Sequence, residues 1–186
     1  MPFSSKSAKP RAFLAESALY DYAVKALGRR MRTEAELHLL MAARVEPGAG
    51  GEAAVRSVLA RLKEREYLND KSYAETYARL RQENEKFGAR RVRNDLRQKG
   101  VRAEVVEEAV NTRYGETSEE ALAREHLERK RIKKPENEKD VARVMRRLVA
   151  AGFSTGTIYK ILRRWDVPEE SLAALDSLTD ETGKEQ

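Results

Sequence analysis

The stretch VRNDLRQKGVRAEVVEEAV, from Val92 to Val110, carries the pattern from which the fold is predicted. Apolar residues stand eight and four positions before Gly100, and again one, six, nine and ten positions after it. This spacing is typical of two helices that each carry one apolar stripe. Glycine can end the first helix because it adopts the left-handed conformation at little cost. The stretch therefore predicts a pair of helices joined by a tight turn.

The same pattern recurs 52 residues later, in VMRRLVAAGFSTGTIYKIL, from Val144 to Leu162, where Gly152 takes the place of Gly100. A more distant copy comes earlier, with a longer loop, EPGAGG, in place of the tight turn. Its stripes are Leu37 and Met41, then Val55, Val58 and Leu59. A further helical segment precedes each pair, over about Glu16–Leu27, Asp70–Lys86 and Ser118–Lys133.

These internal repeats predict an all-α fold, an elongated array of three tandem three-helix repeats. Each repeat buries little alone, so stability is shared with its neighbours and a long surface forms in place of a pocket. The predicted divisions are a flexible basic arm (1–15), three repeats (16–66, 67–114 and 115–166) and an acidic tail (167–186).

Charge is distributed unevenly along the 186 residues, 37 % of which are charged and 6 % aromatic. From Asp166 onward there are seven acids and one base, a net charge of −6, which leaves +12 on residues 1–165. A basic body suggests a polyanionic partner, and the acidic tail suggests a competitor for the same surface. The alternative is that these charges only keep the chain soluble.

Several classes of site are excluded or disfavoured. Cysteine is absent, which rules out disulfides and thiolate chemistry. No apolar run approaches the roughly 20 residues of a membrane span, and the N-terminus lacks a signal-peptide core. We therefore expect a cytoplasmic protein that does not contact a membrane.

No constellation typical of an active site is present. His38 and His126 are far apart in sequence, and GAGG (48–51) lacks the Lys-Ser/Thr of a phosphate loop. The carboxylates lie in mixed-charge runs, which are typical of solvated helix faces. We expect no catalytic residue, no metal site and no cofactor, and hence a protein that is not an enzyme.

The basic segments are the strongest functional candidates. On a helix, Arg90, Arg93 and Arg97 fall within an arc of roughly 60°, away from the stripe of Val92 and Leu96. Arginine pairs in two-pronged fashion with phosphate or carboxylate. The alternative is a hydrated face that only confers solubility. The predicted partner-binding residues are Arg90, Arg91, Arg93, Arg97, Lys99, Arg129, Lys130, Arg131, Arg146, Arg147, Arg163 and Arg164.

A second hypothesis comes from residues 144–165, which resemble a DNA-binding helix-turn-helix. In such a motif, Thr155, Thr157 and Lys160 would face the major groove of DNA. The apolar residues of the same segment match the preceding repeat position for position, which favours a structural repeat. Both interpretations stay open at this point.

The repeats bring a known family into view. YLNDKSYAETYARLR (67–81) followed by FGARRVRNDLRQKGV (87–101) resembles the middle repeat of the RecX family, bacterial regulators of the RecA recombinase. RRLVAAGFSTGTIYKIL (146–162) is similar to that family's last repeat, and ALYDYAVKALGRRMRTEAEL (18–37) to its first. The EPGAGG loop departs from the family's tight turn.

This resemblance implies a small cytoplasmic protein of three-helix repeats that modulates RecA. Members of the family bind along the groove of the RecA–DNA filament and generally suppress its ATPase and strand-exchange activities in homologous recombination. The expected partners are therefore the RecA filament and DNA, the latter without strong sequence preference. We expect a monomer without cofactors.

Overall fold

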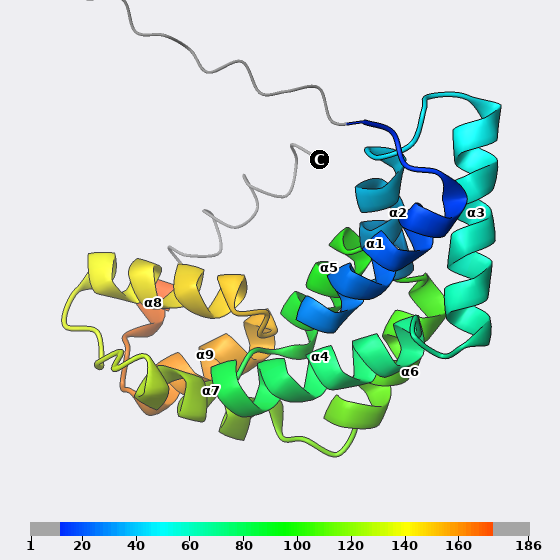
Figure 1. Ribbon diagram of the computed structural model, residues 1–186. Coiled ribbons are helices and arrows are strands. Elements are labelled where there is room, and N and C mark those ends of the chain that lie inside the picture. Colours follow the sequence, from blue (N-terminus) through cyan, green and yellow to red (C-terminus); the bar gives the residue numbers. More distant parts are fainter. Residues whose placement is uncertain (1–11, 173–186) are drawn as a thin grey trace, which may run out of the picture. The chain divides into compact units, whose positions relative to one another are not determined.

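Helices form all the regular secondary structure between residues 12 and 172, the part of the chain that the computed structural model describes (Figure 1). The predicted all-α class is confirmed. Residues 1–11 of the predicted arm and residues 173–186 of the predicted tail lie outside the described part. The helices are α1 (Glu16–Arg29), α2 (Glu34–Ala42), α3 (Ala49–Glu64), α4 (Asp70–Glu85), α5 (Ala89–Gln98), α6 (Ala103–Tyr114), α7 (Glu119–Arg129), α8 (Glu138–Ala150) and α9 (Thr155–Arg164).

Three of these helices fall within each of the ranges 16–66, 67–114 and 115–166, whose boundaries themselves stay predictions. By its internal contacts the chain forms two compact units. Unit 1 comprises the residues up to Tyr73 together with Lys99–Val101, and unit 2 comprises the remainder. One predicted helix was too long: it ends at Arg129 and does not reach Lys133, because Arg131 adopts a left-handed backbone conformation, with φ of 51°.

The core of unit 1 is built from α1, α2 and α3, which pack against one another. Leu37 and Met41 of α2 and Val55 and Val58 of α3 are fully buried, as their spacing predicts. Thr33 begins α2 by accepting a hydrogen bond from the backbone N–H of Glu36, at 3.1 Å. The looser first copy of the pattern therefore forms the same kind of helix pair despite its longer loop.

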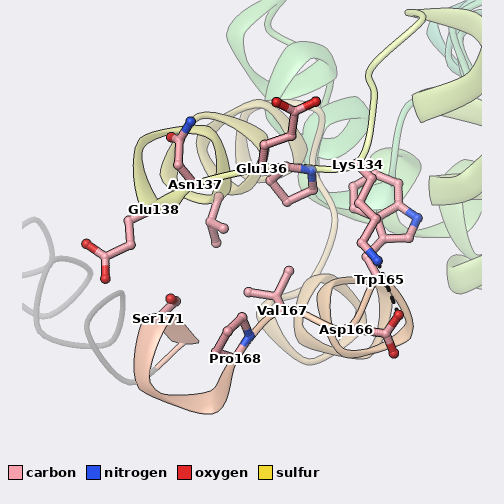
Figure 2. Close-up of a pocket in the computed structure, with 11 residues that line it drawn as sticks. Lys134, Glu136, Asn137, Glu138, Trp165, Asp166, Val167, Pro168 and Ser171 are labelled. Carbon is pink, nitrogen blue, oxygen red and sulfur yellow. Dashed lines mark hydrogen bonds and ion pairs between the residues drawn. The ribbon is translucent and has the colours of Figure 1, made fainter.

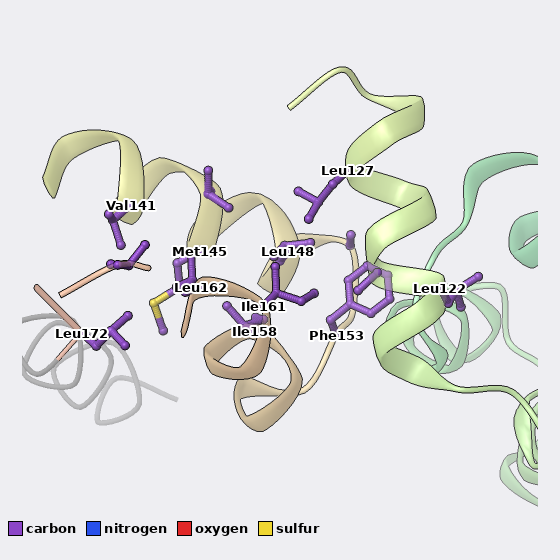
Figure 3. Close-up of a cluster of buried hydrophobic side chains, with 14 residues drawn as sticks. Leu122, Leu127, Val141, Met145, Leu148, Phe153, Ile158, Ile161, Leu162 and Leu172 are labelled. Carbon is purple, nitrogen blue, oxygen red and sulfur yellow. The ribbon is translucent and has the colours of Figure 1, made fainter. Parts of the chain in front are cut away.

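In unit 2, α7, α8 and α9 surround a second cluster of buried side chains (Figure 3). Phe153, in the turn between α8 and α9, is buried on the side of the cluster toward α7. Val167 and Leu172 are also buried in this cluster. The chain therefore stays packed for several residues beyond the end of the predicted third repeat.

Leu96 tests the predicted stripe of α5, because its side chain is fully buried. Replacing Leu96 with alanine is expected to lower the free energy of unfolding by about 2–5 kcal/mol, since the change leaves a cavity. Leu80→Ala, at an exposed position on α4, is expected to change it by no more than about 0.5 kcal/mol. Urea denaturation followed by circular dichroism measures both. Equal effects of the two changes would contradict the core assignment.

Each unit contains the same contact between a turn and the start of a helix. In unit 1, the Thr33 hydroxyl donates to the carbonyl of Lys99 at 2.6 Å, and Gly100 packs against Ala35. In unit 2, the backbone N–H of Gly88 donates to the carbonyl of Ala151 at 2.8 Å. Gly100, in the turn between α5 and α6, thus lies against the start of α2. Gly152, in the turn between α8 and α9, lies in the same way against the start of α5. The sequence pattern does not predict this contact.

The start of α8 differs from the start of α5. On the 52-residue shift, Asp140 occupies the position of Gly88. The backbone N–H of Asp140 bonds within the chain, to the side-chain oxygen of Asn137 at 3.0 Å. At α5, the backbone N–H of Gly88 donates to a carbonyl of the following turn. At α8, the corresponding N–H already has an acceptor in Asn137.

Candidate functional site

The arginines of α5 do not form a uniform free surface. Arg93 Nε donates to Glu107 of α6 at 2.9 Å, and Arg97 Nη2 donates to the other oxygen of the same carboxylate at 2.8 Å. Arg93 also donates to Asn111 at 2.9 Å. One acid on α6 thus holds two of the three arginines that the sequence places on one face. Exposed ion pairs of this kind are worth about 0.2–1 kcal/mol each, so an anionic partner can compete for them.

The twelve predicted partner-binding residues divide into two groups. Seven form ion pairs with nearby carboxylates: Arg91, Arg93, Arg97, Lys99, Lys130, Arg163 and Arg164. Five are exposed and form no ion pair with another residue of the described range: Arg90, Arg129, Arg131, Arg146 and Arg147. The second group is therefore the one whose charge is most available to a partner.

Three of the predicted residues converge on one groove of unit 2, which we call the basic groove. It has a volume of about 480 Å³ and is lined by Phe87, Arg91, His126, Lys130, Ile132, Arg147, Ala150 and Ala151. Residues from the start of α5, from α7 and the segment after it, and from the end of α8 thus meet here. No carboxylate lines the groove, so the three cations stand beside an apolar floor.

Arg91 fixes one wall of the basic groove. Its Nε pairs with Asp95 at 2.9 Å, and its Nη1 donates to the carbonyl of Ala150 at 3.3 Å. The guanidinium also lies 5.7 Å from the ring centre of Phe87, within the range of a cation–π contact. Arg147 has no such contacts among the described residues. The groove therefore combines one fixed cation with one that is free to adapt.

His126 lies buried at the floor of the basic groove. Its ring stands 5.9 Å from that of Phe87 and 5.8 Å from that of Phe153. Its Nδ1 is 2.9 Å from the carbonyl of Glu85, which requires a hydrogen on that nitrogen. Burial lowers the pKa of His126, and the nearby charge of Lys130 lowers it further, although the Glu85 carbonyl acts in the opposite direction. The neutral ring with hydrogen on Nδ1 is therefore the form that the fold favours.

This arrangement predicts a pH dependence of stability. Because the pKa of His126 is lower in the folded chain, the unfolded chain binds more protons below pH 6.5, the ordinary value. The contribution is fully present above that pH and is lost as pH falls, by at most about 1.4 kcal/mol per pH unit. Urea denaturation between pH 5 and 8 measures it. His126→Asn, which retains a donor toward Glu85, should have a shallower slope, and an unchanged slope would contradict the assignment.

A second hollow in unit 2 lies where α8 begins (Figure 2). Its lining includes the acids Glu136, Glu138 and Asp166, and Asp166 pairs with Lys134 at 3.2 Å. Mixed charges and an exposed ion pair do not resemble a reaction centre. Within residues 12–172, no cluster of three or more acidic, histidine or cysteine side chains is arranged to hold a metal ion. The same range contains no helix with the length and apolar character of a membrane span.

The helix-turn-helix interpretation meets an obstacle at α9. Thr157 is buried, and its hydroxyl donates to the carboxylate of Glu119 at 2.6 Å. The Ser154 hydroxyl donates to the same carboxylate at 2.5 Å. Burial acts to raise the pKa of Glu119, but these hydrogen bonds outweigh it and hold that pKa below the usual value. Thr157 is therefore engaged inside unit 2, and of the three predicted base-reading residues only Thr155 and Lys160 are exposed.

The apolar floor of the basic groove was missed from the sequence. Phe87 precedes His126 by 39 residues and Ile132 by 45, so no local spacing connects it to them. From the sequence, His126 is only a histidine far from His38, and no pattern places it in a groove. The available signal was its position four residues before Lys130 on a helix that also carries Leu122 and Leu127.

Comparison with known proteins gives consistent results. A family model described as "RecX, second three-helix domain" matches residues 69–110. A protein named "Regulatory protein RecX" from Leptothrix cholodnii is 32 % identical over 149 residues, covering 80 % of this chain and 90 % of the relative. A protein of the same name from Thermus thermophilus is 32 % identical, with 80 % and 91 % covered. The one from Mycolicibacterium vanbaalenii is 33 % identical over 153 residues, with 81 % and 80 % covered.

Two solved structures share the fold. The crystal structure of RecX from Lactobacillus salivarius superposes with a TM-score of 0.59 at 22 % identity, covering 81 % of this chain and 96 % of that one. A second, titled "Crystal structure of regulatory protein RecX", gives a TM-score of 0.63 at 21 % identity, covering 80 % and 71 %. At these identities the likeness supports the arrangement of helices alone.

Proposed function

The chain belongs to the RecX family. We propose that it is a cytoplasmic regulator of the RecA recombinase and that it catalyses no reaction itself. Its relatives are named regulatory proteins, and it spans nine tenths of the length of two of them. We propose that it binds the filament that RecA forms on DNA and suppresses RecA's ATPase and strand exchange. Binding would do so by occupying the filament's working surface or by trapping one of its conformations.

The basic groove is the observation that carries this proposal. Arg91, Lys130 and Arg147 offer charge to an anionic surface, and the floor of Phe87 and Ile132 offers apolar contact. The core of a protein–protein interface combines apolar contact with charge in this way. We therefore assign the groove to contact with the protein part of the filament. The exposed cations Arg90, Arg129, Arg131 and Arg146 are assigned to non-specific attraction toward DNA.

The test is RecA's hydrolysis of ATP on single-stranded DNA, measured with and without this protein at two salt concentrations. We expect substoichiometric amounts to lower the rate, and the effect to weaken as salt rises. If saturating protein left both the rate and the lifetime of the filament unchanged, regulation of RecA by this chain would be refuted.

Glu107 supplies a prediction in which removing a charge strengthens binding. Glu107→Gln frees Arg93 and Arg97 from their shared carboxylate, so both become available to an anionic partner. We expect affinity for single-stranded DNA to rise on the order of 2- to 5-fold at moderate salt, the worth of exposed ion pairs. Fluorescence anisotropy with a labelled oligonucleotide measures it. Glu104→Gln, on the same helix, is the matched control, and equal gains in both would remove the role of Glu107.

Sequence-specific DNA binding through α9 is the alternative, favoured by the exposure of Thr155 and Lys160. It predicts one preferred duplex sequence, with a mismatched base pair costing about 1–3 kcal/mol. Equal affinity for unrelated duplexes, with a steep dependence on salt, would exclude it.

A further inference from the structure

Arg32 in unit 1 is an arginine without a partner among residues 12–172. It lies between α1 and α2, and it is half-buried. Its guanidinium forms no hydrogen bond and no ion pair with any residue of the described range, and its Nε is inaccessible to solvent. An N–H that is buried without an acceptor lowers stability. The half-buried side chain also lines an open hollow, where a binding partner can accept hydrogen bonds from it.

The other arginines with an unbonded, buried Nε are each compensated. The guanidinium of Arg44 lies 5.0 Å from the ring centre of Tyr22, and Arg113 donates through Nη2 to Glu83 at 2.9 Å. Arg32 has neither a ring contact nor a carboxylate in the described part of the chain. Arg32 therefore differs from Arg44 and Arg113 because no contact within the described residues compensates its charge.

Arg32 lines a small cup of about 130 Å³. Leu27, Met31, Glu66, Tyr67, Asn69, Ser72 and Tyr73 form the rest of its lining. Met31 and Tyr67 are exposed by 49 % and 58 %. The cup thus places Arg32, which has no ion pair within residues 12–172, near the exposed side chains of Met31 and Tyr67.

The backbone beside Arg32 is held in place before any partner arrives. Thr33 is fully buried, caps α2 through its side chain, and donates to the carbonyl of Lys99 at 2.6 Å. Little ordering of the backbone is then needed on binding, and this lowers the cost of association. The cup is preorganised to accept a side chain.

We infer that this cup receives a carboxylate side chain, Asp or Glu, from an acidic segment of a protein partner. The carboxylate would accept hydrogen bonds from Arg32, while an apolar neighbour on the same segment would cover Met31 and Tyr67. Tyrosine, methionine and arginine are the residues enriched in protein–protein interfaces, and tyrosine and arginine dominate their binding energy.

A nucleic acid fits the cup less well. Its backbone carries one charge per roughly 3.4 Å of each strand and needs a strip of cations. Within the described part of the chain, the cup instead offers a single cation. The structure therefore favours a protein partner for this contact.

This inference deepens the proposed function and rests on it only for the identity of the partner tested, the RecA filament. In the full chain, Arg32→Met should reduce affinity for RecA assembled on single-stranded DNA by about 10- to 100-fold, the range of an interface arginine. Arg30→Met removes the same charge at an exposed position two residues away and should change affinity less than about 3-fold. Equal effects of the two variants would overturn the inference, because charge alone would then explain them.

A second measurement needs no RecA. Hydrocinnamate, a phenyl ring on a short carboxylate chain, is titrated into the full chain and observed in two-dimensional proton–nitrogen spectra. We expect the Arg32 Nε–H signal to shift with a dissociation constant on the order of 1–10 mM. The neutral amide of the same compound, and the acid added to Arg32→Met, should give no such shift. Equal shifts with acid and amide would overturn the carboxylate assignment.

Thermal unfolding separates a binding role from a structural one. Because Arg32 has no partner within the described chain, Arg32→Met should leave the melting temperature unchanged or raise it. A marked fall would show that the arginine stabilises the fold, and it would overturn the inference. If wild-type protein binds hydrocinnamate but not the RecA filament, the proposed function fails while the cup's preference for a carboxylate stands.

Discussion

Unit 2 is expected to be strongly destabilised when Gly152 is replaced by valine. Gly152 has a φ of 90°, and a Cβ there would overlap the backbone nitrogen of Arg91 and come within 2.5 Å of its Cβ. The left-handed conformation costs a residue with a side chain about 1–3 kcal/mol, and overpacking costs a similar amount. The sum of roughly 2–6 kcal/mol is a large part of a typical stability of 5–15 kcal/mol.

The fluorescence of Trp165, the chain's single tryptophan, reports on unit 2 during urea denaturation. Gly156→Ala is the matched control, because it lies in α9 with nothing within 4 Å of the added Cβ. Alanine there is expected to stabilise by about 0.5–1 kcal/mol through its helix propensity. A Gly152→Val protein that unfolds at the wild-type urea concentration would show that the close turn contact is not required.

Arg147→Glu is expected to weaken binding to the RecA filament by about 10- to 100-fold. The change reverses the one cation of the basic groove that has no partner among the described residues, and it places a carboxylate beside Lys130 and Arg91. Loss of an attractive contact and gain of a repulsive one together reach the 1.4–2.8 kcal/mol that this range represents. Affinity is measured by equilibrium binding to RecA filaments on single-stranded DNA.

Arg146→Glu makes the same change of charge one residue away, outside the groove lining, and should weaken binding less than about 3-fold. Circular dichroism should show the same helix content in both variants, since both side chains are exposed. If the two reversals weaken binding equally, the overall positive field attracts the partner and the groove has no special role.

Much of the fold follows from the sequence, because the apolar spacing around Gly100 and Gly152 reports directly on burial. Val92, Leu96 and their counterparts Val144 and Leu148 are all buried. Such periodicity is a local property, and it specifies which face of a helix meets a core. The elongated form of the array stays a prediction.

The candidate site followed from the sequence only in part. Charge counting found Arg91, Lys130 and Arg147, but it gave them no common location because they lie on separate segments. It also gave no indication that Glu107 holds Arg93 and Arg97. Ion pairing and grooves depend on which helices are neighbours, and that information is distributed over contacts between residues far apart in the chain.

The first turn of α8 limits how many modules such a chain can join. At α5, the N–H of Gly88 is left for the carbonyl of the next turn, whereas at α8 Asn137 satisfies the corresponding N–H of Asp140. A fourth module fused after α9 would find this N–H already bonded to Asn137. Lengthening this architecture, by gene duplication or by engineering, therefore requires releasing the N–H of residue 140 from Asn137.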